Sequence, residues 1–178
     1  MIQIFTTGGT IDKVYFDSES AYEVGEPQIA DILRAAGVDV ETAVVTLLRK
    51  DSLEMTDADR ALVAVAVRDC GAEHVVVTHG TDTMAATARV VAIALADALA
   101  EGSGGAGKTV VFVGSLTPAR FKASDAEFNV GFAMAAVQTL APGVYVAMNG
   151  RVFDPHQVRK SRARNRFEEA PSTAGGPS

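Results

Sequence analysis

The stretch Val75-Val76-Val77-Thr78-His79-Gly80-Thr81-Asp82-Thr83-Met84 decides the fold. Its valine run predicts a strand that is buried on both faces, because such strands read as continuous β-branched runs. Gly80 permits a tight turn and Asp82 is a good helix N-cap, so an Ala-rich helix over about 83–100 should follow. The polar residues between the two elements then lie at the carboxyl end of a strand, where open α/β sheets bind ligands. Taken alone, the stretch is equally typical of an ordinary capped turn between a strand and a helix.

Predicted strands and helices alternate along most of the remaining chain. Further strands are expected over residues 2–5, 42–48, 109–113 and 144–148, and further helices over about 27–37, 57–69 and 125–140. Such alternation specifies right-handed βαβ units. We therefore expect an α/β fold, a three-layer Rossmann-like or flavodoxin-like domain with a mostly parallel sheet and helices on both faces. After the last of these strands, Asn149-Gly150 predicts a hairpin turn into Arg151-Val152-Phe153.

Three segments fall outside this pattern. Residues 13–26 are polar and resemble a long loop over the edge of the sheet, of the kind that forms lids or binding loops. Residues 101–107 are rich in glycine and predict a flexible connector. The sequence favours one catalytic-type domain over 1–160, followed by a tail over 161–178 that is first basic, then rich in Pro, Gly and Ser, and expected to be loosely ordered.

Composition excludes several classes of protein. The 178 residues suffice for one sizeable core, and 48% hydrophobic with 21% charged residues is ordinary for a globular domain. A net charge of −6 argues against a nucleic-acid partner. The single cysteine, Cys70, excludes an internal disulfide, and the three histidines are too scattered for a metal site. No run is long enough for a membrane span or a signal peptide, so a cytoplasmic protein without metal is expected.

Polar residues follow strand after strand. The pairs that follow successive predicted strands are Thr7 with Thr10, Asp51 with Ser52, Thr81 with Asp82, and Ser115 with Thr117. Because parallel strands bring their carboxyl ends to one edge of the sheet, these side chains should line a common site. Hydroxyl groups beside helix N-termini suit acyl transfer on a small anionic substrate. A threonine nucleophile needs help to lose its proton, which an unprotonated lysine or a tyrosine could give.

Two motifs carry a family resemblance. Thr7-Gly8-Gly9-Thr10-Ile11 and the heptapeptide over 78–84 resemble the two signature motifs of the bacterial-type L-asparaginases. The resemblance continues through Asp51-Ser52, through residues 113–118 and 146–150, and on to Asp154 and Lys160, and so covers most of the chain.

The resemblance implies catalytic roles for particular residues. Thr10 matches the nucleophile that forms an acyl-enzyme with the amide carbon of the substrate. Tyr22 matches the tyrosine that closes over this threonine, with Tyr15 as a rival for the role. Thr81, Asp82 and Lys160 match a second catalytic threonine with its aspartate and its lysine. Without the family spacing, Lys160 would be interpreted as a solvated lysine in a basic tail.

Substrate-binding roles follow from the same resemblance. Ser52 matches the residue that binds the α-carboxylate of the substrate, with Asp51 beside it. Asp82 also binds the α-amino group, and Thr81 and Gly9 complete the substrate-binding set. No cofactor is implied. His79 is expected to be a structural residue of the turn.

The chain also departs from the family pattern. Typical members have a second, C-terminal domain, whereas this sequence ends soon after Lys160 and resembles short-chain members that keep only the N-terminal domain. The glycine-rich continuation common after the first motif is replaced by Asp12-Lys13-Val14, and Leu53 stands where many members carry a polar residue. These departures bear on substrate affinity and selectivity more than on the type of reaction.

The sequence therefore predicts an L-asparaginase that hydrolyses L-asparagine to L-aspartate and ammonia. One alternative is an amidohydrolase for glutamine or another small amide. Another is a non-catalytic domain that binds an amino acid, although such a domain would need Asp82 and Ser52 but not two threonines and a lysine.

Three predicted helices are apolar nearly all round, over 61–67, 90–96 and 130–137. A helix on the surface of a monomer normally keeps a polar face. We therefore expect a homodimer or a higher homo-oligomer, with Val91 and Leu95 as contact residues if their helix forms the interface.

Overall fold

The computed structural model describes residues 1–16, 21–105 and 107–170. Within these residues, a six-stranded sheet with the order β4-β1-β5-β6-β7-β8 forms the centre of the domain. Its strands are β1 (Ile2–Gly8), β4 (Thr42–Lys50), β5 (His74–Thr78), β6 (Thr109–Val113), β7 (Gly143–Met148) and β8 (Arg151–Phe153). The first five run parallel, and β8 returns antiparallel to β7 after the turn at Asn149-Gly150. The predicted α/β fold with a mostly parallel sheet is confirmed.

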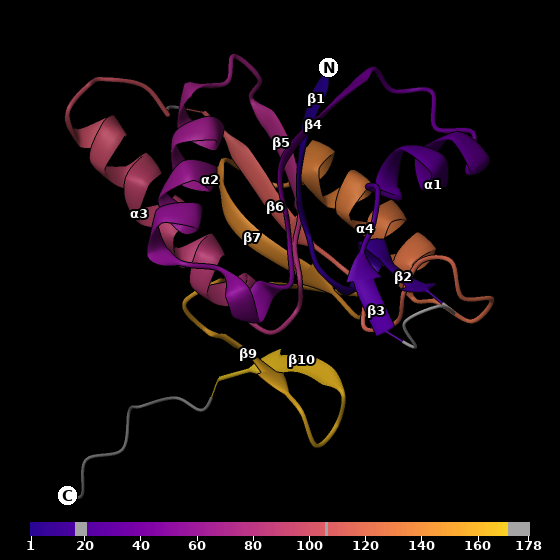
Figure 1. Cartoon of the computed structure of the whole chain (residues 1–178). Coiled ribbons are helices and arrows are strands. Elements are labelled where there is room, and N and C mark those ends of the chain that lie inside the picture. The colour runs from indigo at the N-terminus through magenta and orange to yellow at the C-terminus, as the bar shows by residue number, and fades with distance from the viewer. Residues whose placement is uncertain (17–20, 106, 171–178) are drawn as a thin grey trace, which may run out of the picture.

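Helices cover both faces of the sheet, so the predicted three layers are present (Figure 1). α2 (Asp57–Asp69) and α3 (Met84–Ala100) lie on one face, and α1 (Ile29–Ala35) and α4 (Ala126–Thr139) lie on the other. β5 contributes to a hydrophobic cluster on each face of the sheet. Val75 and Val77 belong to the cluster under α2 and α3, and Val76 belongs to the cluster under α1 and α4. This alternation explains why its sequence is a continuous valine run.

The segment after the first motif is a hairpin and not the predicted long loop. β2 (Lys13–Phe16) pairs antiparallel with β3 (Ala21–Val24). Both arms contain β-branched and aromatic residues, which favour a strand even in a polar context. The backbone N–H of Gly25 donates to the carbonyl of Asp12 at 2.8 Å and closes the base of this hairpin.

A second hairpin replaces part of the tail that was expected to be loosely ordered. β9 (Val158–Ser161) pairs antiparallel with β10 (Arg166–Glu169), so the prediction was wrong for residues 161–170. The physical reason is burial: Val158 and Phe167 are 4% and 3% exposed and pack into the core under α2 and α3. Figure 1 shows this hairpin beyond the carboxyl ends of the parallel strands. Residues 171–178 lie outside the described part of the chain.

The outward faces of α2 and α3 differ from the sequence-based expectation. Val91 and Leu95 are buried in the domain core, at 0% and 8% exposed, so naming them as contact residues between protomers was wrong. The exposed apolar side chains of these two helices are Leu62, Val65, Ile93 and Leu99. Among the described residues, no helix is long and apolar enough to cross a membrane.

Candidate active site

Close backbone packing brings three strand ends together. Gly9 has φ 94°, a conformation that strongly favours glycine, and a Cβ there would overlap the backbone of Gly80. A Cβ on Gly80 would in turn lie 2.6 Å from the Oγ of Ser52. The glycines therefore allow the turns that carry Thr10, Thr81 and Ser52 to meet at one edge of the sheet.

Thr10 begins the short 3-10 helix η1 (Thr10–Asp12), directly after β1. Its side chain is partly exposed, whereas Ile11 beside it is fully buried and anchors the turn. Within the part of the chain that the structure describes, the Thr10 hydroxyl makes no hydrogen bond. The hydroxyl is therefore not committed to a structural role among these residues.

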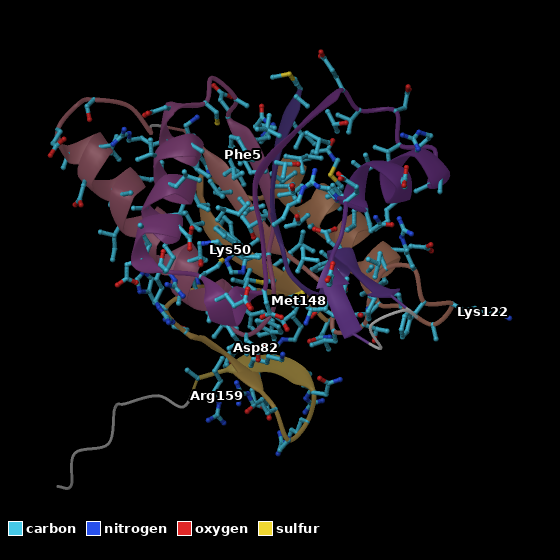
Figure 2. The ribbon with its side chains drawn as sticks, in the orientation of Figure 1. Phe5, Lys50, Asp82, Lys122, Met148 and Arg159 are labelled. Carbon is cyan, nitrogen blue, oxygen red and sulfur yellow. The ribbon has the colours of Figure 1, made fainter. Side chains whose placement is uncertain are left out.

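Thr81, Asp82 and Lys160 come together across 79 residues of sequence. Nζ of Lys160 donates to Oγ1 of Thr81 at 2.7 Å and to Oδ1 of Asp82 at 3.1 Å. Thr81 is 2% exposed and the Lys160 side chain 17%, so these contacts are shielded from bulk water. Arg162 adds a second cation 3.6 Å from the same Asp82 oxygen. Figure 2 shows Asp82 at the edge of the sheet that faces the C-terminal hairpin, which carries Arg159.

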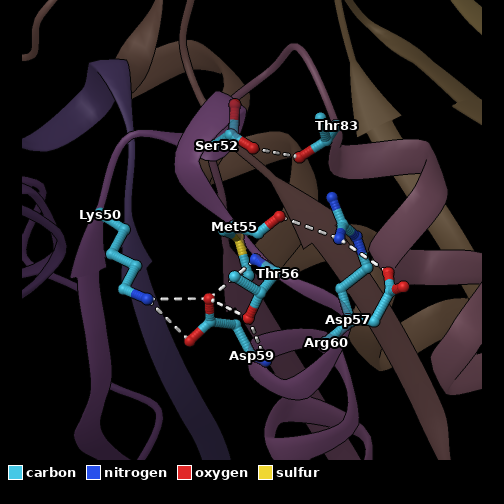
Figure 3. A network of polar contacts seen from close by, with 8 residues as sticks. All are labelled: Lys50, Ser52, Met55, Thr56, Asp57, Asp59, Arg60 and Thr83. Atoms are coloured by element: carbon cyan, nitrogen blue, oxygen red, sulfur yellow. Dashed lines mark hydrogen bonds and ion pairs between the residues drawn. The ribbon is translucent and has the colours of Figure 1, made fainter.

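Ser52 opens the second 3-10 helix, η2 (Ser52–Glu54), after β4. It is 2% exposed, and its carbonyl accepts a hydrogen bond from the Thr83 hydroxyl at 2.7 Å (Figure 3). This bond ties the Ser52 turn to the start of α3. The predicted neighbours Ser52, Thr81 and Asp82 thus belong to segments that contact one another.

Asp51 lies beside Ser52 and pairs with Lys13, for which the sequence pattern predicts no role. Its Oδ2 is 2.7 Å from Nζ of Lys13, and its Oδ1 accepts from the backbone N–H of Leu53 at 3.0 Å. Desolvation alone would raise the pKa of Asp51. The bonds from Lys13 and Leu53, together with the charges of Lys13 and Lys160, outweigh it and lower this pKa, so the carboxylate is ionised at neutral pH.

The loop below Ser52 is held by a compact polar network (Figure 3). Thr56 caps α2 in a capping box with Asp59, and Nζ of Lys50 contacts both Asp59 oxygens at 3.0 and 2.8 Å. The hydrogen bonds from Lys50 and Thr56 lower the pKa of Asp59 to about 2. Arg60 donates to the carbonyl of Met55 at 3.0 Å. The network fixes the chain between β4 and α2, the segment that contains Ser52.

Two cavities flank the site. One of about 410 Å³ lies against Lys13, Asp51 and Leu53. The other, of about 300 Å³, lies against Asp82, Arg89 and Lys160. Both are large enough for an amino acid, so a small amide has room on either side of the polar cluster.

Some polar residues of the predicted site have structural partners instead. The Thr7 hydroxyl donates to the carbonyl of Thr78 at 2.9 Å, and the Ser115 hydroxyl donates to that of Thr117 at 2.5 Å. His79 is fully buried, and its Nδ1 lies 2.8 Å from the carbonyl of Gly80. Burial lowers the pKa of His79 to about 4, so it is neutral at pH 7, in agreement with the structural role expected for it.

Asp12 lies two residues after Thr10, in the same 3-10 helix. No local sequence pattern predicts that it is buried. It is 2% exposed, and its Oδ1 accepts from the backbone N–H of Gln28 at 2.8 Å. Its Oδ2 is buried without a hydrogen-bond partner among the described residues. Burial therefore raises the pKa of Asp12 to about 6. The only hint in the sequence was that Asp12 departs from the glycine-rich family pattern.

Tyr22 and Tyr15 face each other as backbone partners in the β2–β3 hairpin. Their side chains lie outside the described part of the structure, so the geometry leaves their predicted roles as predictions. Among the described residues, no group of three or more His, Cys, Asp or Glu side chains is placed to hold a metal ion.

Comparison with known proteins identifies what the chain is similar to. The family model described as "Asparaginase, N-terminal" matches residues 1–172. A probable periplasmic L-asparaginase of Haemophilus influenzae is 30% identical over 90% of this chain and 46% of its own length. A glutamyl-tRNA(Gln) amidotransferase protein of Methanococcus vannielii is 26% identical over 86% of this chain and 35% of its own length.

Solved structures show the same similarity. The structure of a probable cytoplasmic L-asparaginase from Campylobacter jejuni superimposes with a TM-score of 0.78 at 28% identity, over 97% of this chain and 53% of that one. The chain thus spans about half the length, or less, of the curated relatives that it matches.

Proposed function

This chain belongs to the asparaginase family, and from that premise we propose that it hydrolyses L-asparagine to L-aspartate and ammonia through a threonine nucleophile, without a cofactor. The observation that carries the proposal is the Lys160–Thr81 hydrogen bond of 2.7 Å on a turn that packs against the Thr10 turn, whose hydroxyl makes no hydrogen bond among the described residues. A basic side chain buried against one hydroxyl, with a second hydroxyl nearby, is the arrangement that acyl transfer needs.

In the proposed first step, Oγ1 of Thr10 attacks the side-chain amide carbon of asparagine. The proton of the Thr10 hydroxyl is transferred to the leaving nitrogen as the C–N bond breaks, so that ammonia departs and an ester on Thr10 remains. Tyr22 is our proposed partner of Thr10 in this step. In the second step, water attacks the ester, aspartate is released and the proton returns to Thr10. The amine of Lys160, which donates to Thr81, is the proposed relay that moves the water proton to the departing oxygen of Thr10.

The substrate's charged groups have complementary partners in this proposal. The Asp82 carboxylate binds the α-amino group, and Ser52 with Asp51 beside it receives the α-carboxylate end. Because Gly9 packs closely on Gly80, the Thr10 turn lies against the Thr81 turn. One bound amide can then contact residues of both turns. The cations Lys13 and Lys160, which lower the pKa of Asp51, offset the charge that this carboxylate brings toward an anionic substrate.

A second candidate is the hydrolysis of another amide. It is favoured by the similarity to the glutamyl-tRNA(Gln) amidotransferase protein and by the two cavities beside the site, which leave room for a larger substrate. A domain that only binds an amino acid is the candidate from a different class. The Lys160–Thr81 contact argues against it, because binding alone does not require a buried amine on a hydroxyl.

Ammonia release decides among these candidates. The purified chain is incubated with asparagine, with glutamine and with buffer alone, and the Thr10→Ala variant is run in parallel. Asparagine-dependent release that the variant lacks supports the proposal. Release from glutamine alone assigns the second candidate. Saturable amino-acid binding without release from either amide assigns the binding domain and overturns the enzyme.

We also propose that the chain forms a homodimer or a higher homo-oligomer. α2 and α3 pack side by side, and each exposes apolar side chains, Leu62 and Val65 on α2 and Ile93 and Leu99 on α3. A second copy is the proposed cover of this face. Light scattering should give at least twice the monomer mass, and Ile93→Glu should reduce it. A monomer at micromolar concentration for the unmutated chain rejects this assembly.

A cytoplasmic location is our proposal for the compartment, and it follows the name of the Campylobacter jejuni structure. The name of the Haemophilus influenzae relative gives the periplasm instead. Cell fractionation of the producing organism, with detection of this chain by antibody, separates the two.

A further inference from the structure

The strand opposite Lys160 is held to the domain by the side chain of Asn149. Oδ1 of Asn149 accepts a hydrogen bond from the backbone N–H of Phe167 at 2.9 Å. In the β9–β10 hairpin, Phe167 is the residue directly paired with Lys160. We infer that Asn149 is a positioning residue for Lys160. It holds the hairpin in the position from which Nζ of Lys160 reaches Thr81 and Asp82. This inference rests on the proposed function.

Asn149 is itself fixed from the interior of the domain. It has φ 54° in the turn between β7 and β8, and its backbone N–H donates to Oδ1 of Asn129 at 3.3 Å. Asn129 is 1% exposed on α4, and its Nδ2 donates to the carbonyl of Gly114 at 3.1 Å and to Asp125 at 2.8 Å. The chain of bonds runs from a buried amide on α4 through Asn149 to the backbone opposite Lys160. These bonds tie the position of the hairpin to α4 in the core of the domain.

Apart from Lys160 itself and the Arg162–Asp82 pair, in which Arg162 is 76% exposed, the hairpin has few directional contacts with the domain. The Arg159–Glu168 and Arg164–Glu168 pairs join one part of the hairpin to another and do not reach the domain. The Arg151–Glu169 pair does reach it, but both side chains are more than half exposed, and such pairs hold weakly. Buried Val158 and Phe167 anchor the hairpin by packing, which is not directional. Asn149 adds a directional contact to the backbone of the hairpin.

The catalytic consequence comes from the short contacts of Nζ. Lys160 lies 2.7 Å from Oγ1 of Thr81 and 3.1 Å from Oδ1 of Asp82. A displacement of about 1 Å takes both contacts beyond good hydrogen-bond length and is enough to reduce catalysis by about 100-fold. Loss of the Asn149 acceptor therefore acts on Lys160 without removing any group that touches the substrate.

Two substitutions separate the side chain of Asn149 from its backbone. Asn149→Gly keeps the left-handed turn, since glycine adopts positive φ freely, but it deletes the acceptor. Asn149→Asp keeps an oxygen at the Oδ1 position and is the conservative rescue. If Asn149 served only to form the turn, both variants would behave like the unmutated chain.

The first experiment measures asparagine hydrolysis by these variants. Asn149→Gly should lower kcat at least tenfold with KM within threefold, and Asn149→Asp should stay within threefold in both. In a Lys160→Met background, Asn149→Gly should cause less than a twofold further change. A kcat within twofold of the unmutated chain, an effect on KM alone, or an equal loss in both backgrounds overturns the inference.

The second experiment does not depend on turnover. Lysine acetylation by acetic anhydride is followed by peptide mass spectrometry, with exposed Lys122 as the internal reference in the same chain. Asn149→Gly should raise the labelling of Lys160 relative to Lys122 at least threefold, and Asn149→Asp should leave the ratio unchanged. An unchanged ratio in Asn149→Gly overturns the positioning role. If the unmutated chain hydrolyses no amide, the proposed function fails while this ratio still decides the role of Asn149 in placing Lys160.

Discussion

Thr10 and Thr81 are both threonines at the carboxyl ends of parallel strands, but their hydroxyls have different surroundings. Thr81 is 2% exposed and bonds to Lys160 at 2.7 Å. Thr10 is partly exposed, and its hydroxyl has no hydrogen bond within the described residues. The Thr81 hydroxyl already accepts a bond from an amine, whereas the Thr10 hydroxyl has no partner among the described residues. The difference is consistent with the proposed mechanism, in which the Thr81 turn handles protons and Thr10 attacks the substrate.

The two turns are also fixed by different means. The Thr10 turn depends on close packing of Gly9 on Gly80 and on buried Ile11. The Thr81 turn shares this packing through Gly80, and in addition Lys160, in a hairpin 79 residues away, donates to the Thr81 hydroxyl. Substitutions in the first turn should therefore remove chemistry directly, whereas those in the second should also act through the position of the hairpin.

Removing the Thr10 hydroxyl tests whether Thr10 is the attacking threonine, and it has the largest expected effect. Thr10→Ala should reduce kcat for asparagine by at least about 1,000-fold, on the scale of a lost nucleophile, and leave the fold intact. Steady-state ammonia release measures the rate, and circular dichroism checks the fold. Thr10→Ser is the matched control, because it keeps a hydroxyl and should retain part of the activity. Activity of Thr10→Ala within tenfold of the unmutated chain reverses the assignment of the two threonines.

Removing the Lys160 amine tests whether the Thr81 turn handles protons. Lys160→Met should lower kcat by at least about 100-fold, the scale of general-base catalysis, because Thr81 then has no base. Lys122→Met is the control, since Lys122 is exposed and projects from an edge of the molecule far from Asp82 (Figure 2). A change confined to KM would make Lys160 a charge that binds substrate and would leave Thr81 without a catalytic partner.

The sequence predicts the elements that local pattern determines. The valine run at 75–77 indicates a strand buried on both faces, and the structure places it in the middle of the sheet with both cores against it. The turn at Asn149-Gly150 is likewise where the sequence places it. In each case the signal lies within a few neighbouring residues.

Features that depend on tertiary closure were missed. Lys160 is found through the family resemblance, but its local context is that of a solvated tail, and the burial of Val158 and Phe167 is what holds that segment as a hairpin. Val91 and Leu95 were assigned to the outside because an all-apolar helix does not reveal which face meets the sheet. The burial of Asp12 arises from the packing of the β2–β3 hairpin base and α1, which no local pattern encodes.

Asp12 lies in the same 3-10 turn as Thr10, and its titration should change the stability of the folded chain. Its pKa is about 6 in the folded chain against an ordinary value of 3.8. The folded state thus holds the proton more tightly, and the free energy of unfolding should fall as pH rises from about 4 to about 6. Asp12→Asn mimics the protonated form and should remove this fall. At pH 7.5 it should stabilise the chain by at most about 3 kcal/mol, at 1.36 kcal/mol per pKa unit.

Thermal unfolding of both proteins at pH 4.5 and pH 7.5 measures this effect. The melting temperature of Asp12→Asn should exceed that of the unmutated chain at pH 7.5, and the difference should shrink at pH 4.5. Asp31→Asn is a suitable control, because that carboxylate is exposed in a surface pair with Arg34. Parallel pH dependences for Asp12→Asn and the unmutated chain would mean that the carboxyl under the Thr10 turn does not titrate in this range.

The smallest effect concerns the Ser52 turn, which touches both threonine turns through Gly80. Oγ1 of Thr56 accepts from the backbone N–H of Asp59 at 3.2 Å and caps α2 (Figure 3). Thr56→Ala should cost about 1 kcal/mol of unfolding free energy, whereas Thr56→Ser keeps the cap and should cost less. Because Thr83 independently holds the carbonyl of Ser52 at 2.7 Å, kcat and KM should stay within about twofold. Urea unfolding and ammonia release on the same preparations measure both quantities. If KM for asparagine instead rose with the loss of stability, the cap would be needed to place Ser52, and the substrate-binding turn would depend on distant support, as the Thr81 turn depends on the hairpin.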